Sequence, residues 1–176
     1  MKNSDKLLSS TWQKYQCLTA ICAQAQHQAT NDPTGSFVKT ISLPHWGQKV
    51  TEQRSSISNY FDELQQSLIE FGFIEMVAVF ERLVFSQLEK EVFQDLSPSL
   101  QKAANKAHSH PPNVKRLLEA KLPRQLNAQL AEIIEHRNWL IHGKRLGSQS
   151  TLGLDEVHSI LSEILDILGQ SRADIG

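Results

Sequence analysis

The chain has 176 residues, 40% of them hydrophobic, which is enough to bury a self-sufficient core, so we expect a single domain over residues 1–176. The first 30 residues are too polar for a signal peptide, and the longest apolar run, Phe71 to Phe80, is too short to span a bilayer, so we predict a cytoplasmic protein with no membrane association. The formal net charge is −1, yet residues 97–147 hold nine Lys or Arg against three Asp or Glu, a local charge of +6 that is compatible with a polyanionic partner and also with chance.

Two long helices are predicted in the first half of the chain. Apolar residues spaced by three or four predict a helix over residues 4–29, and the Pro- and Gly-containing stretch 31–48 predicts a loop. From Val50 to Leu96 there is no proline, and two apolar stripes predict one long helix with a kink at Gly72. Its second half, Phe73–Phe85, is apolar nearly all round, so we expect it to be buried on more than one side, in part by a second subunit.

Shorter helices are predicted in the second half. Prolines bracket short helices near 98–107 and 112–121, and a further helix opens at Pro123 and runs to about His142, with Gly143 as its C-cap glycine. After a glycine-rich loop, a last amphipathic helix covers Leu154 to Leu168. No segment alternates with period two for long enough to form a sheet, so the predicted fold class is all-α.

Cysteine and histidine spacing predicts no metal site, and no cofactor is expected. Cys17 and Cys22 lie five residues apart on a predicted helix, which is neither the zinc spacing Cys-x-x-Cys nor a disulfide framework, so we expect two buried, reduced thiols. His108 and His110 have no cysteine or carboxylate at ligand spacing, and such a pair seldom binds a metal.

The segment Arg137–His142, which reads Arg-Asn-Trp-Leu-Ile-His, is the strongest candidate for chemistry. Arg and His at this offset are weak evidence alone, because seven of each in the chain give about 0.3 chance occurrences. The context is more specific: the segment closes a helix, precedes Gly143, and follows a long helix that contains Glu81. In this setting the chain resembles the HEPN family (higher eukaryotes and prokaryotes nucleotide-binding) over about residues 57–168, with residues 1–50 less clearly covered.

The resemblance implies a helical bundle built on a long up-down helix pair with short extra helices, and a metal-independent ribonuclease whose site lies at a homodimer interface. Arg137 and His142 match the family's signature pair, and Asn138 matches the polar residue that often follows the Arg. Glu81 occupies the region where some members place a supporting acid. In toxin members paired with a nucleotidyltransferase antitoxin, a Tyr commonly stands two residues beyond the His, where this chain has Lys144, so the resemblance does not extend to tyrosine modification.

The residue types suit this chemistry. Cleavage of RNA without a metal requires the 2′-hydroxyl to attack phosphorus, so a group that titrates near neutrality must move protons and a fixed cation must neutralise the developing charge. His142 and Arg137 fit those two roles. An offset of five residues places them about 140° apart on an ideal helix, so convergence requires a frayed helix end or two copies related by a two-fold axis. We favour the two copies, because the apolar half of the long helix also requires a partner.

The resemblance leaves two function classes open. The first is an RNA endonuclease that acts as a toxin or as a stress or phage-defence effector, with an antitoxin or nucleotidyltransferase as a possible partner. The second is a noncatalytic module that uses the same basic surface to hold RNA, a nucleotide or a protein. Cleavage of RNA in excess EDTA would distinguish the two.

Each candidate residue also has a purely structural interpretation. His142 could be a helix C-cap that interacts with the last carbonyls. Arg137 could form a surface ion pair with Glu132 or Glu135, which would contribute little stability. Glu81 lies among apolar residues and must be paired or neutral, and its partner could be Arg137, Arg82 or a helix N-terminus.

The residues around the motif are equally open. Lys144 and Arg145 are either solvated ends of the helix or RNA-binding contacts to phosphate. Trp12, Trp46 and Trp139 could stack on bases, although a tryptophan within a helix is more often part of a core or an interface.

Overall fold

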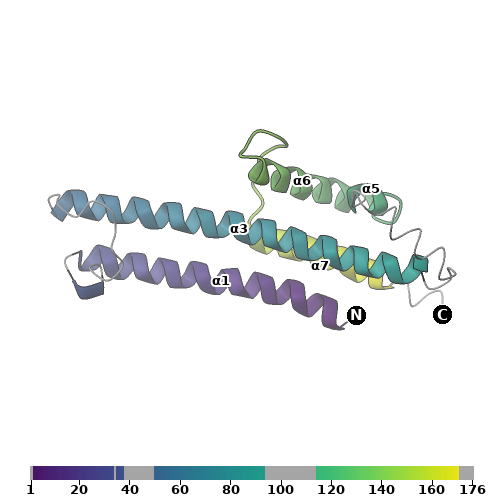
Figure 1. The fold of residues 1–176 in the computed structure, drawn as a ribbon, viewed down its shortest axis with the longest axis horizontal. Helices are drawn as coiled ribbons and strands as arrows, with labels where there is room; N and C mark the ends of the chain where they lie inside the picture. Colours follow the sequence, from purple (N-terminus) through teal and green to yellow (C-terminus); the bar gives the residue numbers. More distant parts are fainter. Residues whose placement is uncertain (1, 34, 38–49, 94–113, 171–176) are drawn as a thin grey trace. The chain divides into compact units, whose positions relative to one another are not determined.

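The computed structural model describes residues 2–33, 35–37, 50–93 and 114–170, and this part of the chain contains helices and turns but no β-strand (Figure 1). The all-α prediction is therefore confirmed for these residues. The long helices are α1 (Lys2–Asn31), α3 (Val50–Phe93), α6 (Arg124–Ile141) and α7 (Leu154–Gln170), and a short α5 covers Val114–Leu118. The expected helix at 98–107 and most of the expected loop at 31–48 lie outside the described residues. In the described part, no helix is long and apolar enough to cross a membrane.

The contacts divide the chain into two compact units. One comprises Met1–Trp12 with Phe73–Gly176, and the other comprises Gln13–Gly72. Both α1 and α3 contribute to both units, and α3 continues as helix through Gly72, where a kink was expected. The prediction of one domain over residues 1–176 stays a prediction.

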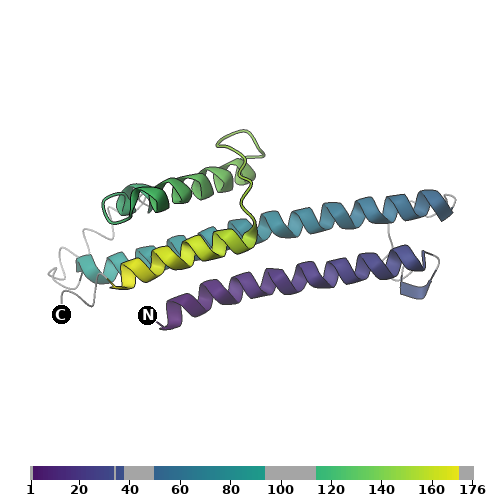
Figure 2. The same ribbon diagram turned by 180° about the vertical axis from the view of Figure 1, so that it is seen from behind.

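The larger unit has one hydrophobic core, to which α1, α3, α5, α6 and α7 all contribute. Figure 2 shows α6 and α7 running alongside the second half of α3, as they also do in Figure 1. The apolar segment Phe73–Phe85 is thus covered on more than one side by its own chain, as expected, and each Val or Phe buried there stabilises the fold by roughly 1.5–3 kcal/mol. Burial by a second subunit stays a prediction. The fully or nearly fully buried core residues include Leu8, Phe73, Met76, Val77, Phe80, Val84, Leu118, Leu130, Ile133, Val157, Leu161 and Ile164.

Polar contacts tie the beginning of α1 to α7 in this unit. The indole N–H of Trp12 donates to Asp155 Oδ1 at 2.8 Å, and its ring stacks on His158 with centroids 4.8 Å apart. The Ser9 hydroxyl lies 3.3 Å from His158 Nε2. Trp12 therefore serves packing between helices, and Trp46, the second candidate for base stacking, lies outside the described residues.

The smaller unit is a pair of helix segments with a small core. Its hydrophobic cluster contains the buried residues Cys22, Ala29, Ile57 and Phe61, and Tyr15 is also buried. Leu18, Leu64 and Phe71 continue the apolar periods that predicted these helices, yet they are exposed, Phe71 by 61%. The reason is geometric: two packed helices bury one narrow face each, and an apolar period alone does not identify which apolar side chains meet a partner.

The two cysteines do not share a face. Cys22 is buried and Cys17 is exposed, so the expectation of two buried thiols was wrong for Cys17. Five residues correspond to about 140° around a helix, which takes one thiol out of the interface when the other is in it. Burial raises the pKa of the Cys22 thiol, because the charged thiolate is disfavoured away from water.

Candidate functional site

Helix α6 carries the candidate motif on its last turns. It begins after Pro123 and ends at Ile141, with His142 as its C-cap, so the predicted bounds are confirmed to within a residue. Leu130, Ile133 and Ile134 bury one face of α6 in the core of the larger unit. At its start, the Asn127 side-chain amide donates to the carbonyls of Glu119 and Leu122, which fixes the turn between α5 and α6. The motif therefore lies at the end of a firmly anchored helix.

The structure brings three of the four candidate catalytic residues together. Arg137 Nη2 donates to Glu81 Oε1 of α3 in an ion pair, and Arg137 Nη1 donates to Asn138 Oδ1 at 3.1 Å. The pair is half-buried, with 22% of the Arg137 side chain and 26% of the Glu81 side chain exposed. Of the partners considered for Glu81, Arg137 is the one that the structure selects.

The acids near Arg137 on its own helix are engaged elsewhere, so the surface-pair interpretation of Arg137 was wrong. Glu135 lies 3.9 Å from Lys115 and accepts a hydrogen bond from the Ser148 hydroxyl. Glu132 accepts from the Ser150 hydroxyl at 2.6 Å. Arg137 thus points toward α3 and not along the surface of α6.

The anchoring leaves the guanidinium able to bind an anion. Arginine has five N–H donors, and the described contacts use one on each of its two terminal nitrogens. Glu81 fixes the direction of the planar fork, and the contacts among the described residues leave the remaining donors for phosphate oxygens. The arrangement can hold a cation at a fixed position beside a phosphate.

His142 lies apart from this cluster. It is exposed at the C-cap, and its side chain makes no hydrogen bond, ion pair or ring contact within the described ranges. Its backbone N–H donates to the Asn138 carbonyl at 3.0 Å. Asn138 and His142 are four residues apart and share a helix face, whereas a five-residue offset places Arg137 about 140° away from His142. Among the described residues, no hydrogen bond joins the Arg137 and His142 side chains.

The helix end is closed without the His142 side chain. The N–H of Gly143 donates to the Leu140 carbonyl at 3.4 Å, and the N–H of Lys144 donates to the Trp139 carbonyl at 2.6 Å. These two bonds form a Schellman motif, with Gly143 at φ +62° directly after the C-cap, as a C-cap glycine was expected to be. The imidazole of His142 is not needed for capping.

The loop after the motif folds back onto α6. Gly147 has φ +90°, and a Cβ at this position would lie 2.2 Å from the Glu135 carbonyl oxygen, so only glycine permits the approach. The Ser150 N–H donates to His136 Nδ1 at 3.0 Å. Lys144 and Arg145, the predicted RNA-binding residues, are exposed on this loop, which therefore holds its two cations at a defined end of α6.

No family model, curated protein or solved structure matches this chain.

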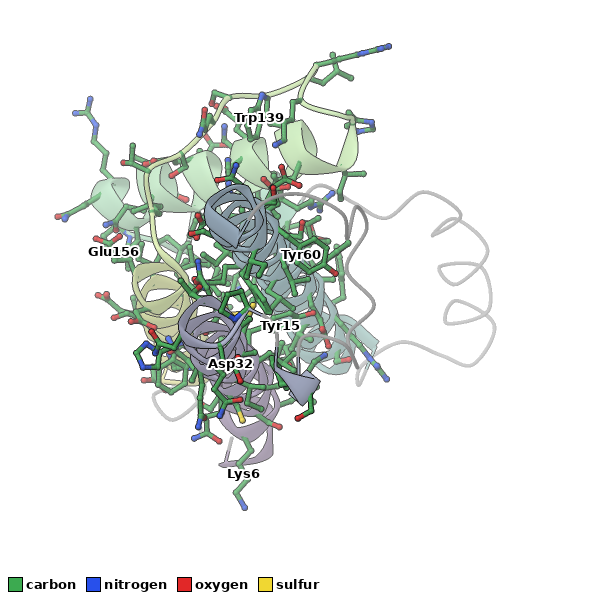
Figure 3. All side chains as sticks on the ribbon, turned by 90° about the vertical axis from the view of Figure 1, so that its left-hand side faces the viewer. Lys6, Tyr15, Asp32, Tyr60, Trp139 and Glu156 are labelled. Carbon is green, nitrogen blue, oxygen red and sulfur yellow. The ribbon has the colours of Figure 1, made fainter. Side chains whose placement is uncertain are left out.

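Sequence reasoning missed His136. It is buried, its ring contacts the ring of Phe73 edge-on with centroids 4.5 Å apart, and it stacks on Trp139 at 5.4 Å. Figure 3 shows the labelled Trp139 where α6 meets the loop. The available signal was position: His136 follows Ile133 by three residues and so continues the buried face of α6.

Within the described ranges, no group of three His, Cys, Asp or Glu side chains could hold a metal ion. His108 and His110, which were considered for metal binding, lie outside those ranges. The site consists of side chains suited to binding an anion and moving protons, namely an anchored arginine and an exposed histidine at one helix end.

Proposed function

We propose that this chain is a HEPN-like, metal-independent RNA endonuclease that acts as a homodimer. The observation that supports it most is the pairing of Arg137 with Glu81 and Asn138, five residues before an exposed His142 whose side chain takes no part in capping the helix. An ion pair between two long helices fixes a cation, and a solvent-facing imidazole can exchange protons. A fixed cation and a group that moves protons are what transesterification of RNA needs in the absence of a metal.

The proposed reaction divides the work between the two residues. The 2′-hydroxyl oxygen forms a bond to phosphorus as its proton leaves to a base, and the bond from phosphorus to the 5′-oxygen breaks as that oxygen takes up a proton. The products are a 2′,3′-cyclic phosphate and a 5′-hydroxyl. His142 moves protons, and the Arg137 guanidinium stabilises charge on the non-bridging oxygens. Glu81 and Asn138 act through Arg137 and are positioning residues.

The homodimer supplies what a single helix lacks. Arg137 and His142 diverge on α6, so a second copy across a two-fold axis would place the histidine of one chain opposite the arginine of the other. Ile141 is 50% exposed beside His142, and Leu146 on the adjacent loop is 60% exposed. Apolar side chains next to a polar motif favour an interface at this end of α6.

The biological role is proposed on the family resemblance alone. A ribonuclease of this type would act as a toxin or as a stress or phage-defence effector, and it would require control by an antitoxin or a modifying partner such as a nucleotidyltransferase. Lys144 in the position of the usual target tyrosine argues for control by binding and not by tyrosine modification.

The test is cleavage of a single-stranded RNA, and of the same RNA with a 2′-deoxy nucleotide at the cleaved position, in excess EDTA. Arg137→Ala and His142→Ala should each lose about 100-fold or more in rate, as expected for removing a transition-state cation or an acid–base group. The matched controls are Arg82→Ala and His27→Ala, which remove an exposed arginine and an exposed histidine elsewhere and should cleave as wild type does. The 2′-deoxy substrate should resist cleavage, because it lacks the nucleophile.

Binding measurements separate the two roles further. Arg137→Ala should also weaken RNA binding and flatten its salt dependence, because one phosphate contact is gone, while His142→Ala should bind nearly normally. Undiminished cleavage by His142→Ala, or cleavage at the 2′-deoxy position, would contradict the mechanism. Binding without cleavage by any of the proteins on several RNAs would favour the noncatalytic module.

A further inference from the structure

Trp139 lies within the candidate motif, two residues after Arg137 and three before His142. Its ring stacks on His136, with an interplanar angle of 22°, and the Lys144 ammonium lies 5.1 Å from the ring centroid. We propose, resting on the ribonuclease function above, that Trp139 is a stacking platform for one unpaired base of the RNA. The base replaces the Lys144 ammonium on the ring, and the ammonium moves to an adjacent phosphate.

The Trp139 ring is supported on one face by the buried ring of His136. His136 is buried, its ring meets Phe73 edge-on at 79°, and its Nδ1 accepts the Ser150 N–H. An imidazole held by Phe73 and by the Ser150 N–H supports the indole that stacks on it, so Trp139 holds its orientation before any ligand arrives. A base that binds such a surface need not order it, which favours binding.

In this proposal, an RNA base displaces the Lys144 ammonium from the Trp139 ring. The backbone of Lys144 is fixed by its N–H bond to the Trp139 carbonyl at 2.6 Å, whereas its side chain is exposed and has four methylene groups to move. A cation–π contact at an exposed site is weaker than the stacking of a nucleobase on an aromatic side chain. A base stacked on Trp139 would take the place of the ammonium, which would then contact the RNA backbone beside Arg145.

The position relative to the motif is also suitable. Trp139 and His142 are three residues apart on α6 and so are neighbours on one face of the helix. A base held on Trp139 would place its own or the next phosphate near the imidazole that moves protons. Bases in a duplex have both faces covered, so the platform selects single-stranded RNA.

The experiment measures binding apart from cleavage. A fluorescently labelled single-stranded RNA is titrated, in EDTA, with the His142→Ala protein and with the same protein carrying Trp139→Phe or Trp139→Leu, and complex formation is followed by anisotropy. Trp139→Leu should weaken binding about 5- to 100-fold, the range expected for loss of one stacked base, while Trp139→Phe should retain most of the affinity. Trp12→Phe is the matched control and should bind the RNA with unchanged affinity, because Trp12 is a residue of α1 that packs against Asp155 and His158 of α7.

A second measurement does not depend on the folding of any Trp139 variant. The His142→Ala protein with native Trp139 is titrated with an abasic strand of the same length and charge, which should bind more weakly than the intact RNA by a similar factor. The proposal that Trp139 stacks on a base is wrong if the abasic strand and the intact RNA bind equally. It is also wrong if the His142→Ala protein binds the RNA equally with Trp139 and with Trp139→Leu. Either result would count even if the wild-type protein cleaves RNA. Binding that depends on Trp139 in a protein that never cleaves would support the platform and contradict the ribonuclease.

Discussion

Arg137 is held by two acceptors of different kinds, the charged Glu81 on α3 and the neutral Asn138 beside it on α6. Glu81, as a charged acceptor, makes the stronger hydrogen bond and sets the direction of the guanidinium. The Asn138 amide oxygen accepts a second hydrogen bond, from Nη1. Because both side chains of the ion pair are about a quarter exposed, the pair contributes only about 1 kcal/mol or less to stability. Its larger effect is on where the positive charge lies.

Glu81→Gln tests that role at the scale of one residue. The substitution keeps the shape of the side chain and removes its charge, so the guanidinium keeps a partner but loses its strongest orientation. We expect kcat for RNA cleavage to fall by roughly 10-fold or more, with little change in KM and a melting temperature within a few degrees of wild type.

The matched control is Glu119→Gln, which neutralises an exposed acid after α5, and it should leave kcat unchanged. Partial recovery of kcat in Glu81→Asp would distinguish positioning by charge from simple packing. Equal kcat for Glu81→Gln and wild type would leave Glu81 with a structural role only.

Individual side chains were predictable from sequence where a physical rule restricted their partners. An acid among apolar residues requires a partner, and this rule correctly included Arg137 among the options for Glu81. His136 was missed because its partners come from Phe73 and from the loop, whose path no local pattern encodes. The exposure of Cys17 followed from helix geometry and could have been predicted from the five-residue offset.

At the scale of elements, the end of α6 depends on two glycines with different requirements. Gly143 needs only its positive φ, since a Cβ there would meet nothing within 4 Å. Gly147 needs both its positive φ and the absence of a side chain, because the Glu135 carbonyl fills that space. The first glycine ends the helix, and the second lets the loop return to it.

Alanine substitutions should separate these requirements. Gly143→Ala should lower the free energy of unfolding by about 1 kcal/mol, the cost of a left-handed residue with a Cβ. Gly147→Ala should lower it by roughly 2 kcal/mol or more, because a backbone segment must also move. Urea unfolding followed by circular dichroism measures both. Equal losses for Gly143→Ala and Gly147→Ala would mean that the loop does not press on α6 as described.

The bounds of α6 and α7 were predictable because proline and glycine mark them chemically. The sequence did not predict which faces of α1 and α3 are exposed in the smaller unit. Leu64 and Phe71 continue an apolar period, yet the single helix opposite buries only Ile57 and Phe61 of that stripe fully. Periodicity predicts that a face can be buried, and the number of partner helices decides how much of it is.

At the scale of the whole molecule, assembly is the property on which the composite site depends. Light scattering should report about 40 kDa, twice the 19.9 kDa chain, at micromolar concentration. The exposed Ile141 and Leu146 are expected in the interface, so Ile141→Glu combined with Leu146→Glu should shift the mass toward one chain and abolish cleavage together.

Leu7→Glu combined with Ile21→Glu is the matched control, because it places the same charges on exposed apolar positions of α1. That variant should remain a dimer and cleave as wild type does. A wild-type protein that is a clean monomer at micromolar concentration, yet cleaves RNA, would contradict the composite site.

The return of the loop onto α6 also fixes a distance along the chain. Gly147 must meet the Glu135 carbonyl and Ser150 must present its N–H to His136, so the two residues between Gly147 and Ser150 connect two anchor points that lie on adjacent residues of α6. Surface loops ordinarily tolerate insertions, but here the number of residues between Gly147 and Ser150 is constrained by the two contacts with α6. One added residue between Gly147 and Ser150 would separate the imidazole from its donor, whereas the same residue added between Lys144 and Gly147 would only enlarge an exposed turn.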